Sequence, residues 1–129
     1  MIVGIGTDII EVERVKNIIE RYGDKFLEKV FAQVEIDYCN TWGEARYQHF
    51  AARFAAKEAF GKAFGTGITA EFKFCDFAVE NDSGGKPIAL LSEEMKSKLV
   101  GCSVFVSLAH LEKLATAYVI IEKNIRSNE

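Results

Sequence analysis

The chain has 129 residues and a mass of 14.4 kDa, a length that favours a single domain over residues 1–129. Its 49% apolar and 27% charged residues exclude a disordered chain, a collagen and a mucin-like stalk. The net charge of -3 disfavours a globally basic nucleic-acid binder. No apolar run approaches the ~18 residues of a membrane helix, and the N-terminus lacks the basic start of a signal peptide.

The first predicted element is a strand over residues 2–10, because isoleucine and valine dominate it. Gly4 and Gly6 leave one face of this strand nearly bare, which indicates the close approach of another backbone or of a ligand. Apolar residues at helical spacing then predict a helix over residues 11–22.

Two short helices are expected next. Gly23 ends the preceding helix, and Asp24 is predicted to cap a helix that runs through Phe31. Another short helical segment is expected over residues 35–39.

The strongest predicted helix covers residues 42–64. Thr41 and Glu44 have the spacing of a capping box at its start, and Gly65 and Gly67 end it. Its interior is rich in alanine, so a neighbouring element can approach it closely.

The second half of the chain is predicted to contain strands and one more helix. Residues 72–80 and 87–91 read as strands around a turn at residues 81–85, and a helix over residues 92–100 begins at the cap residue Ser92.

A last pair of strands is expected over residues 103–109 and 115–122, followed by a polar tail from Asn124. Helices mixed with hairpins favour an α+β fold, in which an antiparallel sheet packs with one long and several short helices.

Several common motifs are absent. Residues 4–9 open like a dinucleotide-binding loop, but the third glycine is missing and the first two lie inside the predicted strand. Residues 84–87 are not a phosphate-binding Walker loop, since proline follows the lysine. Ser107 and His110 have no local hydrolase signature around them. The three cysteines, Cys39, Cys75 and Cys102, lack zinc-ligand spacing, and we expect free thiols in a reducing cytoplasm.

Asp8 lies near the end of an apolar strand, where an unpaired carboxylate would be costly to bury. Two interpretations remain open: the residue caps the following helix, or it holds a cation.

Glu58 shares a helical face with Phe54 and Lys62, at four-residue steps. An exposed Glu58–Lys62 pair is one interpretation, worth only ~0.3 to 0.5 kcal/mol. The other is that Glu58 and Lys62, with Arg53 nearby, handle a metal-bound phosphate, because Mg²⁺ is usually held by one or two carboxylates and substrate phosphates.

Arg14, Ile18, Arg21 and Lys25 recur at intervals of four, three and four. If the helix continues past Gly23, they form a basic surface with an apolar residue in it. This basic helix surface is either an ordinary solvated face or a docking site for an acidic helical partner.

Four segments spread over nearly the whole chain carry a family pattern. They are residues 4–11 (GIGTDIIE), residues 53–60 (RFAAKEAF) running on to 62–68 (KAFGTGI), Asn81-Asp82 with Gly85-Lys86-Pro87, and residues 106–110 (VSLAH). In order and spacing they resemble the holo-(acyl-carrier-protein) synthase family, the small bacterial 4'-phosphopantetheinyl transferases. Lys57-Glu58-Ala59 within its long helix is the most specific part.

The resemblance implies an enzyme that transfers 4'-phosphopantetheine from coenzyme A to a serine of apo acyl carrier protein and releases adenosine 3',5'-bisphosphate. It implies that Asp8 and Glu58 ligate Mg²⁺ and that Lys62 neutralises charge on the phosphates. The base is Glu58 or a metal-bound water that Glu58 positions, with Asp8 as the second candidate. It also implies a homotrimer with active sites between subunits. The cysteines, charge and hydropathy described above add the expectation of a cytoplasmic protein with no nucleic-acid or membrane partner.

By the same resemblance, a further set of residues binds the nucleotide of coenzyme A beside Lys62. They are Arg46, Arg53, Gly65, Gly85, Lys86, Pro87 and His110. The carrier protein is expected on the basic helix surface. The chain departs from the family pattern at Gly61, where many members carry serine, and at Leu111, where a hydroxyl residue is common.

Two other functions are compatible with parts of the pattern. A small acyl-CoA thioesterase would also use a carboxylate on a helix, but it needs no metal. A non-catalytic subunit could bind acyl carrier protein through the basic helix surface, but it would leave the pairing of Asp8 with Glu58 unexplained.

Overall fold

The structure is a computed structural model, and it describes residues 1–67 and 72–125. Along the chain these residues form the following strands, α-helices and short 3₁₀ helices: β1 (Ile2–Glu11), α1 (Val12–Tyr22), α2 (Asp24–Val30), α3 (Gln33–Asn40), η1 (Gly43–Ala45), α4 (Arg46–Phe64), η2 (Phe74–Asp76), β2 (Phe77–Asn81), β3 (Pro87–Leu91), α5 (Glu93–Lys98), β4 (Cys102–His110) and β5 (Leu114–Lys123). The expected α+β class, with one long and several short helices, is confirmed.

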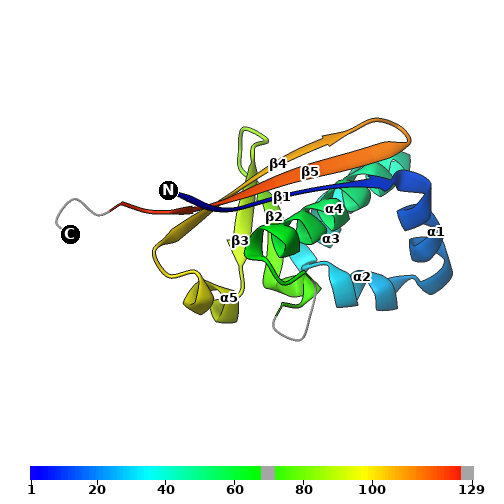
Figure 1. Cartoon of the computed structure of the whole chain (residues 1–129). Helices are drawn as coiled ribbons and strands as arrows, with labels where there is room; N and C mark the ends of the chain where they lie inside the picture. Colours follow the sequence, from blue (N-terminus) through cyan, green and yellow to red (C-terminus); the bar gives the residue numbers. More distant parts are fainter. Residues whose placement is uncertain (68–71, 126–129) are drawn as a thin grey trace.

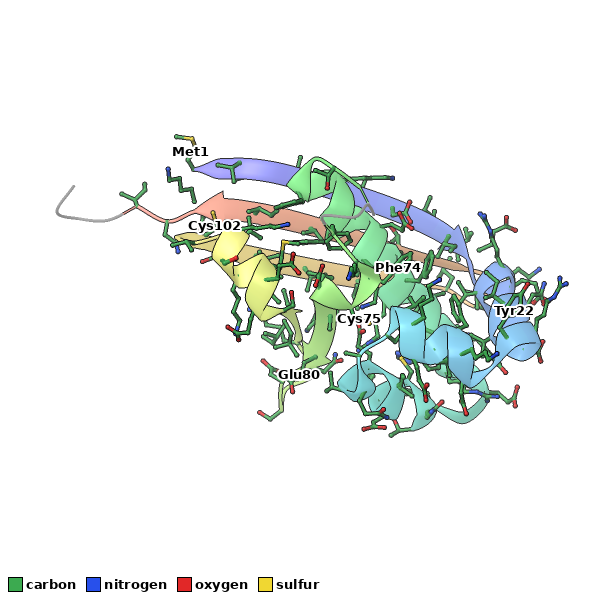
Figure 2. The ribbon with its side chains drawn as sticks, turned by 90° about the horizontal axis from the view of Figure 1, so that it is seen from below. Met1, Tyr22, Phe74, Cys75, Glu80 and Cys102 are labelled. Carbon is green, nitrogen blue, oxygen red and sulfur yellow. The ribbon has the colours of Figure 1, made fainter. Side chains whose placement is uncertain are left out.

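The described strands form two separate antiparallel sheets. Among the described residues, one sheet has the order β1-β5-β4 and β2 pairs with β3 in a separate hairpin. The register places Asp8 opposite Ala117 on β5, and Ala117 opposite Leu108 on β4. Figure 1 shows α4 lying along one side of the β1-β5-β4 sheet, with the other helices beyond it. Seen from the helical side, Met1 and Cys102 lie at one end of the molecule and Tyr22 at the other (Figure 2).

The bare face of β1 packs directly on α4. A Cβ atom added to Gly4 would lie 2.1 Å from the carbonyl oxygen of Ala63, and one added to Gly6 would lie 2.0 Å from that of Ala59. Both distances are far below van der Waals contact, so only glycine fits at these two positions. The prediction of a close backbone approach is therefore confirmed, and the approaching backbone is that of α4.

The hydrophobic core has two parts, which share α4. One lies between α1, α2, α3 and the first half of α4, and includes Phe31 and Phe50. The other lies between the second half of α4, β2, α5 and the inner face of β5, and includes Phe60 and Phe77. Because α4 is buried on most of its circumference, its polar side chains are either paired inside the protein or emerge at its edges.

A fully buried ion pair joins α3 to α4. The ammonium of Lys57 lies 2.8 Å from the Glu35 carboxylate, and both side chains are completely buried. Lys57 also donates to the carbonyl oxygens of Phe74 and Phe77, at 3.1 and 2.5 Å. The Glu35 carboxylate accepts the backbone N–H groups of Ala32 and Val79, both at 3.0 Å. The pair therefore fixes η2 and β2 against α4.

Several local predictions were wrong. Thr41 does not cap the long helix: its hydroxyl donates to the carbonyl of Tyr38 at the end of α3, and α4 begins at Arg46, after η1. Asp24 is the first residue of α2 and makes no capping hydrogen bond, since Gly23 takes the cap position with φ 58°.

Asp8 does not cap α1, because it lies inside β1, which extends to Glu11. The predicted strand over residues 72–80 begins only at Phe77, after η2. The cap at Ser92 is confirmed, since its hydroxyl oxygen accepts the N–H of Met95 at 3.2 Å.

Some predicted features lie outside the described residues: Ile68 in the family pattern, and the end of the polar tail after Ile125. Within residues 1–67 and 72–125, no helix has the length and hydropathy that crossing a membrane requires. In the same residues Cys39, Cys75 and Cys102 are free thiols; burial raises the pKa of Cys39 to about 12, so that thiol stays protonated.

Candidate active site

Asp8 and Glu58 line one pocket of about 290 Å³, together with residues of α1. We call it the carboxylate pocket; its lining residues are Asp8, Ile9, Ile10, Arg14, Val15, Ile18, Phe54 and Glu58. Asp8 reaches it because residues 4, 6, 8 and 10 share the face of β1 that packs on α4. The two acidic residues, fifty positions apart in the sequence, are thus brought to one place.

Lys62 pairs with Asp8 and not with Glu58. Its ammonium lies 3.2 Å from the Asp8 carboxylate and donates to the carbonyl of Thr7 at 3.0 Å. The predicted exposed Glu58–Lys62 pair is not among the ion pairs of the described residues. Partial burial and the charge of Asp8 raise the pKa of the Glu58 carboxyl, while Lys62 acts in the opposite direction.

The donor set of the carboxylate pocket suits a hard divalent cation. A shared cation relieves the repulsion between two carboxylates; this repulsion is the second cause, after burial, of the raised pKa of Glu58. Within the described residues, no group of three or more His, Cys, Asp or Glu side chains could hold a metal. Asp8 and Glu58 would therefore supply only part of a coordination shell, which for Mg²⁺ is ordinarily completed by water and substrate phosphates.

Half of the basic helix surface opens onto the same pocket. Arg14 and Ile18 line it, whereas Arg21 and Lys25 are exposed beyond it. The surface is not one continuous helix as the spacing required, because α1 ends at Tyr22 and Lys25 belongs to α2. The guanidinium of Arg21 lies over the ring of Tyr22, 5.4 Å from its centroid.

A second pocket, of about 170 Å³, gathers predicted nucleotide-binding residues from α4, β3 and β4 and from the turn after β2. We call it the histidine pocket; its lining residues are Tyr38, His49, Ala52, Arg53, Asn81, Gly85, Pro87, Leu108 and His110. Arg53 is 1% exposed; it donates to the side-chain oxygen of Asn81 and lies over the ring of Tyr38, 4.5 Å from the centroid. Its Nε atom has no hydrogen-bond partner among the described residues, although it is buried. A buried donor of this kind indicates that the pocket takes a ligand with acceptor atoms.

Tyr38, His49 and Asn81 complete this pocket, and sequence reasoning gave none of them a functional role. His49 precedes Arg53 by one helical turn, so the four-residue spacing carried a signal for it. Tyr38 and Asn81 join the pocket only through tertiary packing. Burial, His110 and Arg53 together lower the pKa of His49 to about 4.

Other predicted nucleotide-binding residues lie outside both pockets. Arg46 donates to the carbonyl of Gly43 and to the hydroxyl of Tyr47, at 2.9 and 2.8 Å. Gly65 ends α4 in the left-handed conformation, with φ 102°, and Lys86 is exposed in the turn between β2 and β3. None of these three residues lines either pocket, although Lys86 lies between Gly85 and Pro87 of the histidine pocket.

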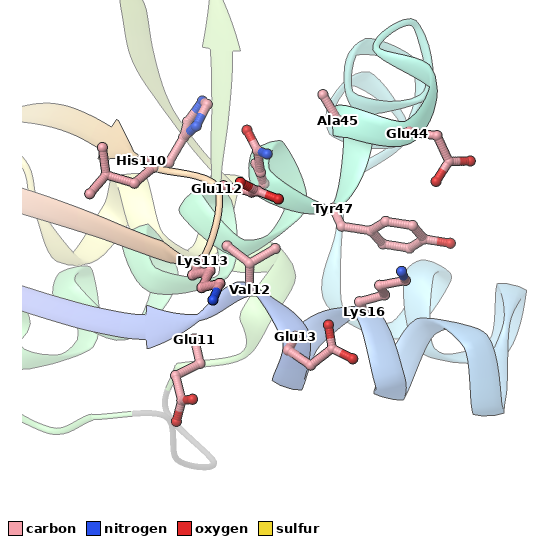
Figure 3. Close-up of a pocket in the computed structure, with 12 residues that line it drawn as sticks. Glu11, Val12, Glu13, Lys16, Glu44, Ala45, Tyr47, His110, Glu112 and Lys113 are labelled. Atoms are coloured by element: carbon pink, nitrogen blue, oxygen red, sulfur yellow. The ribbon is translucent and has the colours of Figure 1, made fainter.

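A third cavity, of about 880 Å³, lies between the start of α1, the start of α4 and the turn between β4 and β5 (Figure 3). It shares His110 with the histidine pocket, but four glutamates and only two lysines line it. We call it the hairpin cavity, after the β4-β5 turn that borders it. Its excess of glutamates repels polyanions, so the phosphates of a nucleotide fit the histidine pocket better.

The two smaller pockets lie on different sides of α4. Arg53 and Glu58 are five residues apart, which turns their side chains about 140° from each other around the helix axis. Asp8 of the carboxylate pocket and Leu108 of the histidine pocket both pair with Ala117 on the central strand β5. They therefore lie on the two opposite edge strands of the sheet. Each pocket holds some of the residues predicted to handle phosphates, and one chain presents the two groups in different directions.

Known proteins match the chain over most of its length. The family model described as the 4'-phosphopantetheinyl transferase superfamily matches residues 4–119. A holo-(acyl-carrier-protein) synthase of Ruminiclostridium cellulolyticum is 48% identical over 120 residues, which cover 91% of this chain and 90% of that protein.

Solved structures of such synthases have the same fold. The enzyme of Neisseria meningitidis superimposes with a TM-score of 0.86 at 33% identity, covering 95% of this chain and 100% of that one. The enzyme of Bacillus anthracis, described as a complex with CoA (3',5'-ADP), superimposes with a TM-score of 0.82 at 39% identity, covering 96% and 99%.

Proposed function

The chain belongs to the 4'-phosphopantetheinyl transferase superfamily, and on this premise we propose that it converts apo acyl carrier protein to the holo form in the cytoplasm, as one domain over residues 1–129. The group transferred is the 4'-phosphopantetheine of coenzyme A, the acceptor is a serine of the carrier protein, and adenosine 3',5'-bisphosphate is released. The observation that carries the proposal is the meeting of Asp8, Glu58 and Lys62 beside the exposed, basic side of α1.

In the transfer, the serine oxygen attacks the β-phosphorus of coenzyme A and the bond from phosphorus to the bisphosphate leaving group breaks. Glu58, or a metal-bound water that Glu58 positions, takes the serine proton, with Asp8 as the alternative base. Lys62 neutralises charge on the phosphate oxygens as it moves to the leaving group. Asp8 and Glu58 would hold a divalent cation, Mg²⁺ by preference, which would supply further charge neutralisation at the diphosphate.

The histidine pocket holds the nucleotide end of coenzyme A. Arg53 and His110 meet an anion there, while Gly85 and Pro87 shape one wall. Arg46, Gly65 and Lys86 contribute from outside the pocket, along the path of the coenzyme. Acyl carrier protein docks on the basic helix surface, where Arg14 and Ile18 border the carboxylate pocket and Arg21 extends the positive charge outwards.

We propose further that the active enzyme is a homotrimer whose sites lie between subunits. The face of the β1-β5-β4 sheet that points away from α4 carries apolar side chains: Ile5 (66% exposed), Ile9 (64%), Phe105 (51%) and Tyr118 (54%). An apolar area of this kind marks a contact with another protein surface. A neighbouring copy on this face would let the carboxylate pocket of one chain work with the histidine pocket of the next.

The test of the reaction is intact-mass measurement of apo acyl carrier protein after incubation with coenzyme A and Mg²⁺. The proposal expects a gain of one phosphopantetheine group, and its loss when a chelator removes the metal. A thioesterase would instead hydrolyse acyl-CoA without metal, and a non-catalytic subunit would leave the mass unchanged. Light scattering tests the assembly: the chain should measure as a trimer, and Ile5→Lys should shift it towards a monomer.

A further inference from the structure

An unusual cluster of rings borders the histidine pocket. The rings of Trp42 and His49 are stacked, with centroids 4.4 Å apart. The edge of His49 meets the ring of His110 at 4.9 Å and the ring of Tyr38 at 5.7 Å. His49 is thus the centre of the cluster, and it lines the pocket itself while Trp42 covers its outer face.

The histidine pocket is lined by basic side chains and by no acidic ones among the described residues. Three of its lining side chains, His49, Arg53 and His110, are basic, and the described residues that line it include no carboxylate. The buried Nε of Arg53 adds a donor without a partner among the described residues. A phosphate group fits this chemistry, because it accepts hydrogen bonds and offsets positive charge.

We propose that His49 belongs to the nucleotide site and takes up a proton when a phosphate group of the coenzyme enters beside Arg53 and His110. This inference rests on the proposed function, since it requires that the histidine pocket holds the nucleotide. His49 does not touch the reacting phosphorus; it acts on binding of the coenzyme and on its pH dependence.

Electrostatics support the direction of the effect. In the free protein the pKa of His49 is lowered to about 4, by burial first, then by His110 and Arg53. The groups that face His49 are Tyr38 from α3, Trp42 from the following turn, Arg53 from its own helix and His110 from β4; none of them carries negative charge at neutral pH. A bound phosphate would supply that charge, offset the positive charge of Arg53 and raise the pKa of His49.

The chain offers its own reporter of this protonation. Trp42 is the sole tryptophan of the sequence and stacks on His49, and a protonated imidazole quenches indole fluorescence. The fluorescence of the free protein should fall near pH 4. With saturating adenosine 3',5'-bisphosphate as the probe, the same fall should occur at about pH 6 or above. Because the chain has two histidines, proton NMR can follow each imidazole separately.

The matched variant is His49→Gln, which keeps a polar side chain but cannot take up the proton. The quantity to compare is the affinity of wild type for adenosine 3',5'-bisphosphate divided by that of His49→Gln. If binding raises the pKa of His49 by two units, this ratio should be about tenfold larger at pH 5 than at pH 7. Calorimetry in buffers of different ionisation enthalpy should detect one proton fewer taken up by the variant at pH 5. Gln48→Asn, next along the helix but facing the hairpin cavity, should behave like wild type.

Two results would overturn the inference and are distinguishable from failure of the enzyme assignment. If the affinity ratio is equal at pH 5 and pH 7 while transfer to carrier protein persists, His49 has no proton-linked role and only this inference fails. If wild type binds neither adenosine 3',5'-bisphosphate nor coenzyme A at any pH, the nucleotide pocket and the proposed function fail together.

Discussion

The ammonium of Lys62 and the carboxylate of Asp8 lie 3.2 Å apart, although 54 positions separate the two residues in the sequence. The contact joins the last turn of α4 to the middle of β1. The side chain of Lys62 is 55% exposed and that of Asp8 is 21% exposed, so the lysine can still reach a substrate at the pocket mouth. This contact with Asp8 explains why Lys62 does not pair with Glu58, which lies one turn away on the same helix.

Replacing Lys62 by alanine should lower kcat by about 10²-fold, with a smaller change in KM for coenzyme A. The reason is that charge on the transferring phosphoryl group shifts in the transition state, where a fixed cation matters most. Steady-state kinetics with both substrates measure this split. A rise in KM at unchanged kcat would show instead that Lys62 binds the ground state and transition state equally.

Glu58→Gln should abolish transfer yet raise the melting temperature of the protein without metal at pH 7. The pKa of Glu58 is raised in the folded state, so its charge opposes folding at any pH above its ordinary pKa, and the amide removes that charge. The stability gain should disappear as the pH falls below about 4.5, where the carboxyl of the unfolded chain is also protonated.

The same variant tests the shared cation. Mg²⁺ should raise the melting temperature of wild type and have less effect on Glu58→Gln or Asp8→Asn. Glu28→Gln, which changes an exposed glutamate of α2, is the control and should respond to Mg²⁺ like wild type. An unchanged response in Glu58→Gln would contradict a metal shared between the two carboxylates.

Reversing Arg14 and Arg21 to glutamate should raise KM for acyl carrier protein by about tenfold at low salt and flatten its dependence on salt. Exposed charges act mainly on the association rate, and 0.1 M salt screens them beyond ~10 Å. The affinity for coenzyme A should stay near that of wild type. The matched control replaces Lys96 and Lys98 on α5 by glutamate. A similar rise in KM for acyl carrier protein in this control would mean that only the net charge matters.

Glu35→Leu should destabilise the protein by about 3 to 5 kcal/mol, because it leaves the buried ammonium of Lys57 without its counter-charge. It also removes the acceptor of the N–H groups of Ala32 and Val79. Glu35→Gln keeps one acceptor oxygen and should cost less. Urea denaturation measures both, with Glu28→Leu as a surface control expected within about 0.5 kcal/mol of wild type.

Sequence reasoning predicted the elements whose apolar periodicity is strong, such as β1, α1 and the long helix. It failed at Thr41 and Asp24, where a residue type that often caps helices is used otherwise because tertiary packing sets the chain direction. The pairing of Asp8 with Glu58 came from family resemblance, since no local pattern connects residues fifty positions apart. The ring cluster around His49 could not be predicted, because it joins α3, α4 and β4 through side-chain packing alone.

The close contact of Gly6 with α4 makes the interior of the protein and its carboxylate pocket one mechanical unit. Asp8 is two residues along the same face of β1, so the depth at which β1 packs on α4 determines how near the Asp8 carboxylate comes to Glu58 and Lys62. A side chain at position 6 would have to displace the strand, and the strand would carry Asp8 with it. The geometry of the pocket is therefore tied to the packing of the core, and a change in the core can alter the spacing of Asp8, Glu58 and Lys62.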